Sequence, residues 1–294
     1  KTILVDYKNI KPRFDELSIC LGFFDGVHLG HQELIKYARK NAKYTLGLLT
    51  FDKPISTLVD NGKNKTVLTS LDDRFKIISK LGVDYYYVFK IDKDFVNLSD
   101  MEFINLLKKM NVKEIFVGKD FKYGKNREGT IYTLQDYFDV KVVDLVSEET
   151  GKIATQNIAN LLLEGKLEEA NKLLGRNYSL SGTIEEGNHI GRTIGFPTIN
   201  LKLTDNYLLP RFGVYKVICY LDNKPYRGIA NVGIKPTISD KNTPNVEIHL
   251  FSFNNEVKCD LINLEFIKFI RDERKFSSLD ELKEQIQKDC EEAF

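Results

Sequence analysis

The hydrophobic pattern changes once along the chain, near residue 175, and this change limits the possible folds more than any other feature. Before it, short apolar runs alternate with stretches in which apolar residues recur at helical spacing. After it, from residue 178 to 270, strand-like segments follow one another with turn residues between them. Because 294 residues suffice for two domains, the pattern predicts an α/β domain followed by an all-β domain.

The first half predicts a parallel sheet flanked by helices, because alternating strands and helices form right-handed crossovers. Ligands of such sheets bind beyond the carboxyl ends of the strands. Two helix starts carry capping signals, Ser70 with Asp73 and the capping box Ser99-x-x-Glu102. The predicted strands are residues 17–21, 45–51, 84–91, 114–118 and 140–146, and the predicted helices include 70–81 and 99–110.

The second half predicts a small closed β-barrel, because short strands are separated by turn residues such as Asp222-Asn223 and Asn254-Asn255. The predicted strands include residues 214–221, 226–231, 246–253 and 264–270. A capped terminal helix is expected after Ser278. Two short helical segments, 155–163 and 167–174, precede the barrel, and we place the domain boundary between residues 176 and 177. The expected domains are therefore 1–176 and 177–294.

Composition and charge narrow the setting in which the protein works. The net charge of +1 gives no electrostatic reason to expect a nucleic-acid or membrane partner. Residues 1–20 mix charged and apolar side chains, unlike a signal peptide, and no apolar stretch is long enough to span a bilayer. The four cysteines are far apart, which favours reduced thiols in a cytoplasmic protein. The sequence leaves open whether the chain forms a homo-oligomer.

The segment GFFDGVHLGHQ, residues 22–32, follows a predicted strand and precedes a predicted helix. Free N–H groups and the helix dipole attract anions at such a junction, and glycines let the backbone approach a ligand. His28 and His31 lie three residues apart within it. The segment therefore predicts a nucleoside triphosphate site without a Walker lysine. The alternative is a tight turn with two surface histidines.

A second candidate site, GNHIGRTIGFPTIN, occupies residues 187–200 in the barrel half. Its glycines, a hydroxyl and a cation suit a loop around phosphate. Thr198 and Asn200 lie two residues apart, so on an extended chain they face the same side. A hydroxyl and an amide oxygen there are suitable ligands for Mg²⁺. The alternative is a glycine-rich hairpin loop.

Glu247 is a third candidate, because a strand at 246–250 would place Glu247 and His249 on one face, opposite three apolar residues. A carboxylate there is able to accept a proton from an attacking hydroxyl. A solvated strand face is the alternative. The composition of the charged run at residues 271–275 does not by itself indicate a function.

Segments spread over nearly the whole chain resemble, in the same order, the bacterial bifunctional riboflavin kinase/FMN adenylyltransferases, also called FAD synthetases. The segments in the first half are GFFDGVHLGHQ at 22–32, VGKDFKYGKNREG at 117–129 and GKLEEANKLLGRNYSLSG at 165–182. Those in the second half are GRTIGFPTINL at 191–201, FGVY, GIANVGIKPT, VEIHL and IRDERKF. The resemblance implies a nucleotidyltransferase-like, Rossmann-type first domain and a flavokinase barrel.

The resemblance also implies two reactions: ATP phosphorylates riboflavin to FMN in the barrel, and a second ATP adenylylates FMN to FAD in the first domain. His28, His31 and Glu247 are the implied catalytic residues, with Mg²⁺ held by Thr198 and Asn200. The implied adenylyltransferase contacts are Gly22, Phe23, Asp25, Gly26, His28, His31 and Thr155 to ATP, and Asp120, Phe121, Asn126 and Arg127 to flavin. The implied kinase contacts are Gly187, Gly191, Arg192, Thr193, Gly195, Thr198 and Asn200 to ATP, and Arg271, Glu273 and Phe276 to flavin.

The first half departs from the pattern that it resembles. The stretch 154–159 has Ala159 in place of an arginine and keeps only Thr155 and Ile158 of the usual Ser-Ser/Thr-Thr-x-Ile-Arg motif. Residues 50–55 lack the usual histidine, and Thr130 stands where Asp is usual. A charge-assisted bond to phosphate contributes roughly 1.5–3 kcal/mol. Three interpretations stay open: a bifunctional enzyme, a riboflavin kinase with weak or lost adenylyl transfer, or a kinase whose first half is a flavin- or nucleotide-binding or regulatory module.

Overall fold

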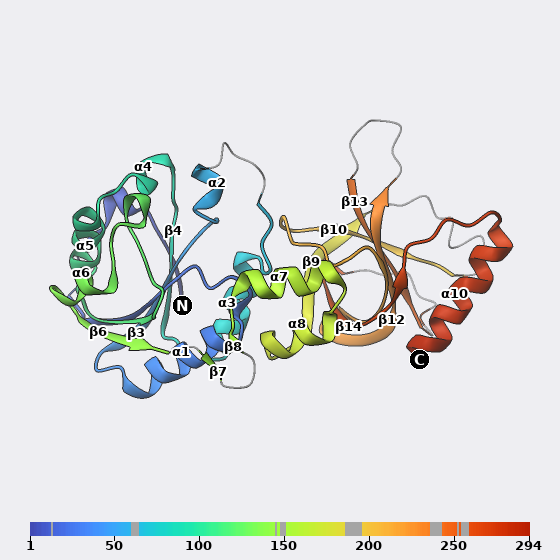
Figure 1. Cartoon of the computed structure of the whole chain (residues 1–294), viewed down its shortest axis with the longest axis horizontal. Helices are drawn as coiled ribbons and strands as arrows, with labels where there is room; N and C mark the ends of the chain where they lie inside the picture. Colours follow the sequence, from blue (N-terminus) through green and yellow to red (C-terminus); the bar gives the residue numbers. More distant parts are fainter. Residues whose placement is uncertain are drawn as a thin grey trace. The chain divides into compact units, whose positions relative to one another are not determined.

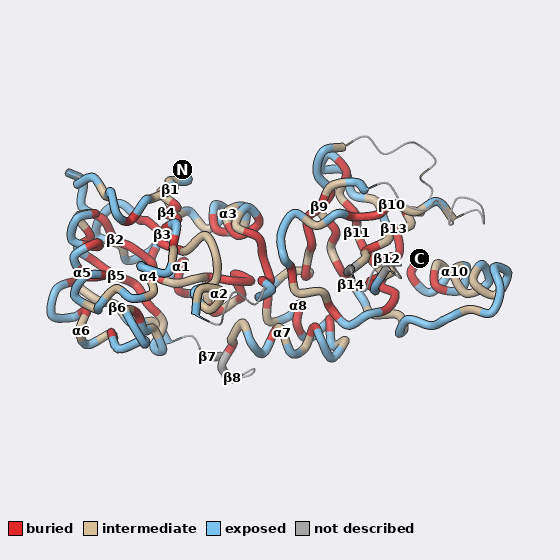
Figure 2. Tube along the Cα trace, turned by 90° about the horizontal axis from the view of Figure 1, so that it is seen from above, coloured by how far each residue is buried: buried red, intermediate tan, exposed pale blue. Residues whose placement is uncertain are grey.

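The computed structural model describes residues 1–12, 14–59, 65–144, 146–147, 151–185, 196–235, 243–251, 253 and 259–294. These residues form two compact units, Lys1–Thr155 and Gln156–Phe294. In both units the buried positions lie mainly along the strands (Figure 2). The predicted pairing of an α/β domain with a closed barrel is confirmed.

The first unit, coloured blue to green in Figure 1, is built on a parallel sheet. The sheet has six strands in the order β1-β4-β3-β2-β5-β6. All five residues of the central strand β2 are buried, because helices cover both faces of the sheet. The strands are β1 (Thr2–Val5), β2 (Leu17–Leu21), β3 (Thr45–Phe51), β4 (Tyr85–Phe89), β5 (Val112–Gly118) and β6 (Asp139–Val143). A short two-stranded sheet consists of β7 (Val146–Ser147) and β8 (Gly151–Lys152).

Two hydrophobic clusters lie on opposite faces of this sheet. Apolar side chains of α1 and α3 pack with Cys20 and Leu48 on one face, and those of α5 and α6 pack with Ile19 and Leu49 on the other. The capping signals at Ser70 and Ser99 do begin α3 and α5. The helices of this part are α1 (Leu29–Asn41), α2 (Ser56–Val59), α3 (Leu71–Ser79), α4 (Lys93–Val96), α5 (Asp100–Lys109) and α6 (Ile131–Gln135). Short 3₁₀ helices are η1 (Tyr7–Asn9), η2 (Asp25–Val27) and η3 (Lys125–Arg127).

The second unit contains a closed antiparallel barrel in the order β10-β13-β12-β11-β14-β9. Alternate residues fill its interior, including Tyr215, Ala230, Ile248 and Phe266, all fully buried. The strands are β9 (Tyr178–Glu185), β10 (Ile199–Leu203), β11 (Gly213–Leu221), β12 (Lys224–Lys235), β13 (Thr243–Leu250) and β14 (Ile262–Asp272). Asp222 and Asn223 form the predicted turn with positive φ, whereas Asn254-Asn255 lies outside the described residues.

Among the described residues of this unit, three helices accompany the barrel: α7 (Thr155–Glu164), α8 (Leu167–Leu174) and α10 (Leu279–Ala293). Asn171 of α8 donates to the carbonyl oxygen of Phe266 at 3.0 Å and accepts from the N–H of Tyr178 at 2.7 Å. Both short helical segments before the barrel therefore belong almost entirely to the compact unit that contains it. The functional boundary between residues 176 and 177 stays a prediction.

Candidate active sites

The GFFDG segment leaves the end of β2 in an unusual backbone conformation. Phe24, Gly26 and Val27 have φ values of 56°, 75° and 40°, which lie in the left-handed region. This region is unfavourable for a β-branched residue such as Val27. The surrounding contacts therefore have to hold the loop in place before α1 begins at Leu29.

Asp25 holds this loop to the segment before α3. Its buried carboxylate accepts hydrogen bonds from the N–H groups of Leu68 and Thr69, each at 3.0 Å, and from the Thr69 hydroxyl. Burial raises the pKa of the Asp25 carboxyl, and the Leu68 N–H, the positive charge of Arg74 and the Thr69 donors oppose that rise. In this structure the carboxylate of Asp25 is a scaffold for the loop, and its predicted contact with ATP stays a prediction.

The two histidines lie together at the start of α1. His28 is the N-cap residue, and its Nδ1 accepts the N–H of His31 at 3.3 Å. The two rings stack with their centroids 3.6 Å apart, and Phe24 meets the His31 ring edge-on at 5.1 Å. Because Nδ1 of His28 accepts a hydrogen bond, Nε2 carries the proton in the neutral ring and is a donor for a ligand.

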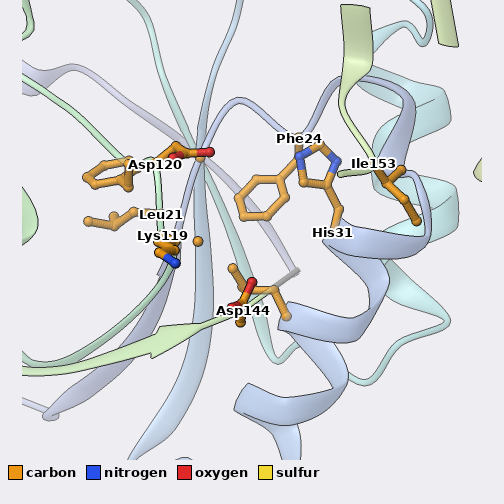
Figure 3. A pocket seen from close by; sticks show the side chains of 11 residues that line it. Leu21, Phe24, His31, Lys119, Asp120, Asp144 and Ile153 are labelled. Atoms are coloured by element: carbon orange, nitrogen blue, oxygen red, sulfur yellow. The ribbon is translucent and has the colours of Figure 1, made fainter. Parts of the chain in front are cut away.

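A cavity of about 390 Å³ lies beside this loop, which is large enough for a small ligand. It is found where the neighbouring strands β2 and β5 end. The strand order reverses between these two strands: β3 and β4 are added on one side of β2, and β5 and β6 on the other. Open α/β sheets bind ligands at such switch points. Figure 3 shows Phe24 and His31 on one side of the cavity, with Lys119 and Asp120 across from them. The lining residues are Leu21, Gly22, Phe24, His31, Leu34, Gly118, Lys119, Asp120, Phe121, Asp144 and Ile153.

The cavity brings together four of the predicted site residues, Gly22, His31, Asp120 and Phe121. Asn126 and Arg127 are not among its lining; they lie in the exposed turn η3, where both have positive φ. Sequence reasoning did not identify Asp144, and it could not place Lys119, one of several cations near this segment, at the site. The rule that ligands bind at strand ends was the available signal for Lys119, which directly follows β5.

Thr155 is also connected to the loop of residues 22–28, which we call the signature loop. Its hydroxyl donates to the carbonyl oxygen of Asp25 at 3.3 Å. In the stretch that lacks the usual histidine, Asp52 accepts the N–H of Ile91 at 3.0 Å. Thr130, which stands where Asp is usual, is bonded locally: its N–H donates to the hydroxyl of Thr133. Thr155 is therefore in reach of the loop that is expected to bind ATP.

The second candidate site lies on the outer face of the barrel. Glu247 on β13 pairs with Asn200 on β10 and with Asn231 on β12, so the three side chains project from one face. Val246, Ile248 and Leu250 are buried on the other face, as the sequence pattern predicts. Asn245 donates to Oε1 of Glu247 at 2.8 Å. The structure thus places Glu247 next to Asn200, across a strand pair.

Thr198 and Asn200 fit a magnesium ion. Thr198 directly precedes β10, and Asn200 is 7% exposed and makes no side-chain hydrogen bond with the described residues. A hydroxyl and an amide oxygen are oxygen donors of the kind that Mg²⁺ prefers, and the neighbouring Glu247 carboxylate adds negative charge beside them. The other predicted phosphate-loop residues, Gly187, Gly191, Arg192, Thr193 and Gly195, lie outside the described residues.

Arg271 is held by the terminal helix. Its Nε and Nη2 donate to the two carboxylate oxygens of Asp289 at 2.8 and 2.6 Å, and Asp289 is only 2% exposed. The guanidinium also lies 5.8 Å from the ring centre of Phe276. Glu273 accepts a hydrogen bond from Asn231 at 3.3 Å. Of the three residues with predicted flavin contacts in the kinase, Glu273 therefore reaches Asn231 on β12, the residue that pairs with Glu247.

A doubly covered parallel sheet with a ligand cavity at its switch point defines a nucleotide-binding α/β domain, and it is joined here to a closed barrel. A family model described as FAD synthetase matches residues 11–157, and one described as riboflavin kinase matches residues 174–294. The bifunctional riboflavin kinase/FMN adenylyltransferase of Bacillus subtilis (strain 168) is 39% identical over 100% of this chain and 97% of its own length. The corresponding protein of Listeria monocytogenes is 38% identical over 98% of this chain and 96% of its own length. The chain belongs to the bifunctional riboflavin kinase/FMN adenylyltransferase family.

A solved structure from Streptococcus pneumoniae, described as a macrolide-efflux protein, has the same fold. It matches with a TM-score of 0.86 and 32% identity, covering 98% of this chain and 97% of that one. Within the part of our chain that the structure describes, no helix combines the length and the apolar character needed to cross a bilayer.

Proposed function

We propose that the barrel unit phosphorylates riboflavin with ATP to FMN, and that the parallel-sheet unit adenylylates FMN with a second ATP to FAD and pyrophosphate. The observation that carries this proposal is the cavity at the switch point, with His31 in its lining and His28 stacked on His31. The similarity to bifunctional relatives along the whole chain supports it.

In the adenylyl step, a phosphate oxygen of FMN attacks the α-phosphorus of ATP, and the bond to the departing pyrophosphate breaks. Negative charge builds on the oxygens of the α-phosphate. The Nε2–H of His28, together with His31 and the N–H groups at the start of α1, is suited to stabilise that charge. Asp120, across the cavity from His31 in Figure 3, and Phe121, which also lines the cavity, are the proposed contacts to the flavin.

In the kinase step, the 5′-hydroxyl of riboflavin attacks the γ-phosphorus of ATP, and Glu247 accepts the hydroxyl proton. The bond between the γ-phosphorus and the β,γ-bridging oxygen breaks, and ADP leaves. Thr198 and Asn200 would hold Mg²⁺, which neutralises phosphate charge when bound. Phosphoryl transfer depends mainly on positioning and charge neutralisation. Arg271, Glu273 and Phe276 are the proposed flavin contacts, with Arg271 oriented by Asp289.

Four statements about the setting belong to the same proposal. Mg²⁺ is the expected cofactor of both reactions, and the reactants are riboflavin, FMN and ATP rather than a nucleic acid or a membrane. The cytoplasm is the expected location, supported by four cysteines that are free thiols in the structure. The proposal leaves open whether the chain acts as a monomer or as a homo-oligomer.

A second candidate function is a riboflavin kinase whose first unit binds flavin or nucleotide without transferring the adenylyl group. Ala159 favours it, because this residue replaces the arginine of the resembled motif. The hydrogen bond from Thr155 to Asp25 favours the bifunctional enzyme, since one part of that motif still reaches the loop.

Incubation of the pure chain with riboflavin, ATP and Mg²⁺, followed by chromatography, tests the proposal. We expect FMN and then FAD, whereas FMN alone would favour the second candidate. Glu247→Gln keeps the size of the side chain but removes its ability to accept the proton, so FMN formation should fall roughly 10²- to 10⁴-fold. FAD formation from added FMN should stay at the wild-type rate in that variant. An unchanged rate of FMN formation would exclude Glu247 as the base.

A further inference from the structure

Arg74 on α3 is a fully buried arginine beneath the loop of the adenylyltransferase site. It is 2% exposed. Its Nη1 donates to the carbonyl oxygen of Phe23 at 2.7 Å and to the hydroxyl of Thr50 at 3.2 Å. Its guanidinium carbon lies 4.4 Å from the centre of the Phe23 ring, a distance at which a cation is attracted to the ring face.

The charge of Arg74 is not neutralised by a contacting carboxylate. Within the described part of the chain, Arg74 forms no salt bridge with an Asp or Glu oxygen at 4.0 Å or less, and its buried Nε lacks a hydrogen-bond partner. The nearby Asp25 carboxylate interacts with the charge of Arg74 through space. A buried cation without an ion pair is costly to maintain. An arginine at this position needs a role that offsets this cost. Its guanidinium contacts Phe23 directly, and Thr50, to which it also donates, donates in turn to the Phe23 carbonyl.

Three carbonyl groups of that loop are held by side-chain donors. Arg74 and Thr50 donate to the Phe23 carbonyl, Thr155 to the Asp25 carbonyl, and Gln32 to the Val27 carbonyl at 2.9 Å. A trans peptide is planar, so a fixed carbonyl oxygen also fixes the direction of the next N–H, opposite to it. The bonds to Phe23 and Val27 therefore orient the N–H groups of Phe24 and His28.

We propose that Arg74 is a positioning residue for adenylyl transfer: by holding the Phe23 carbonyl it keeps the loop and its N–H groups in the orientation that receives the ATP phosphates. Its buried charge also adds to the positive potential beneath the loop. This inference rests on the proposed adenylyltransferase function of the same unit. Arg74 acts through the backbone of the loop and is not a catalytic residue.

Steady-state kinetics of Arg74→Lys and Arg74→Met in the full chain test this role. Lysine keeps the charge but lacks the planar fork, and methionine removes the charge at similar length. We expect kcat for FAD formation from FMN to fall about 10- to 100-fold, more in Arg74→Met, with KM for ATP changed much less. Riboflavin kinase activity in the same chain should stay within about twofold of the wild type.

Leu107→Ala is the matched control for lost stability, because Leu107 is fully buried on α5 in the hydrophobic cluster on the other face of the sheet. All variants are assayed at a temperature where circular dichroism shows them folded. We expect Leu107→Ala to unfold at a lower temperature yet keep its kcat. An equal loss of kcat in Leu107→Ala, or a wild-type kcat in Arg74→Met, would overturn the proposal.

Chemical rescue gives a readout that a purely structural role would not move. In Arg74→Ala, added N-ethylguanidinium should restore FAD formation at least fivefold at concentrations too low to denature the protein, and ethylammonium should restore it less. Equal or absent restoration by both cations would contradict the role of the guanidinium fork. A wild-type chain that forms no FAD would instead contradict the adenylyltransferase function itself.

Discussion

His28 has a different task for each of its two ring nitrogens. Nδ1 accepts the N–H of His31 and so caps α1, which leaves the protonated Nε2 as the donor toward a ligand. The motif GFFDGVHLGHQ predicts this junction, because glycines and histidines precede a helical pattern. It does not predict the carboxylate contacts of Asp25, since Leu68 and Thr69 are more than forty residues away.

A substitution that keeps the cap separates these two tasks. Asn is a good N-cap residue, so His28→Asn should leave the stability of the unit within about 1 kcal/mol of the wild type. It removes the imidazole donor, and FAD formation should fall roughly 10²- to 10³-fold, as on loss of an oxyanion donor. Product chromatography and thermal unfolding measure the two effects. A FAD rate close to the wild type would exclude His28 from catalysis.

Among the elements, α10 shows what a sequence pattern conveys about a helix and what it omits. Ser278 caps it by accepting the N–H of Glu281, as the sequence predicts. The sequence pattern does not predict which element its apolar face packs against. In the structure, Ile286, Cys290 and Ala293 pack against Val214 and Ile229 of the barrel. The same limit applies to α8, because its pattern of apolar residues is compatible with packing against either the parallel-sheet domain or the barrel.

The ion pair between Arg271 and Asp289 attaches α10 to β14. Removing the buried carboxylate leaves the Arg271 charge without its partner, so Asp289→Asn should lower the free energy of unfolding of the barrel by about 2–3 kcal/mol. An unfolding curve in urea, with riboflavin kinase activity as the readout, measures this change in the free energy of unfolding. Glu292→Gln is the control, because the Glu292–Lys268 pair on the same helix is half exposed and should contribute less than about 1 kcal/mol. Equal effects of the two variants would contradict a special role for Asp289.

On the scale of the whole molecule, each proposed site is built within one compact unit. The cavity and its histidines belong to Lys1–Thr155, and Asn200, Glu247 and Arg271 belong to Gln156–Phe294. The change of hydrophobic period predicts this division into α/β and barrel parts. It cannot assign α7 and α8, because an amphipathic helix shows how much surface it buries and not against which domain. Nor can it place Lys119 and Asp144 together, since only the folded sheet brings them to one cavity.

The central claim is that one chain transfers a γ-phosphate at one site and an adenylyl group at the other. The most direct test supplies riboflavin and Mg²⁺ with ATP labelled at either the γ- or the α-phosphate, and follows the label into each flavin. We predict that γ-label enters FMN and is retained in FAD, and that α-label enters FAD alone. Label from the γ-phosphate in FMN, with no α-label in any flavin, would contradict the claim and leave a riboflavin kinase.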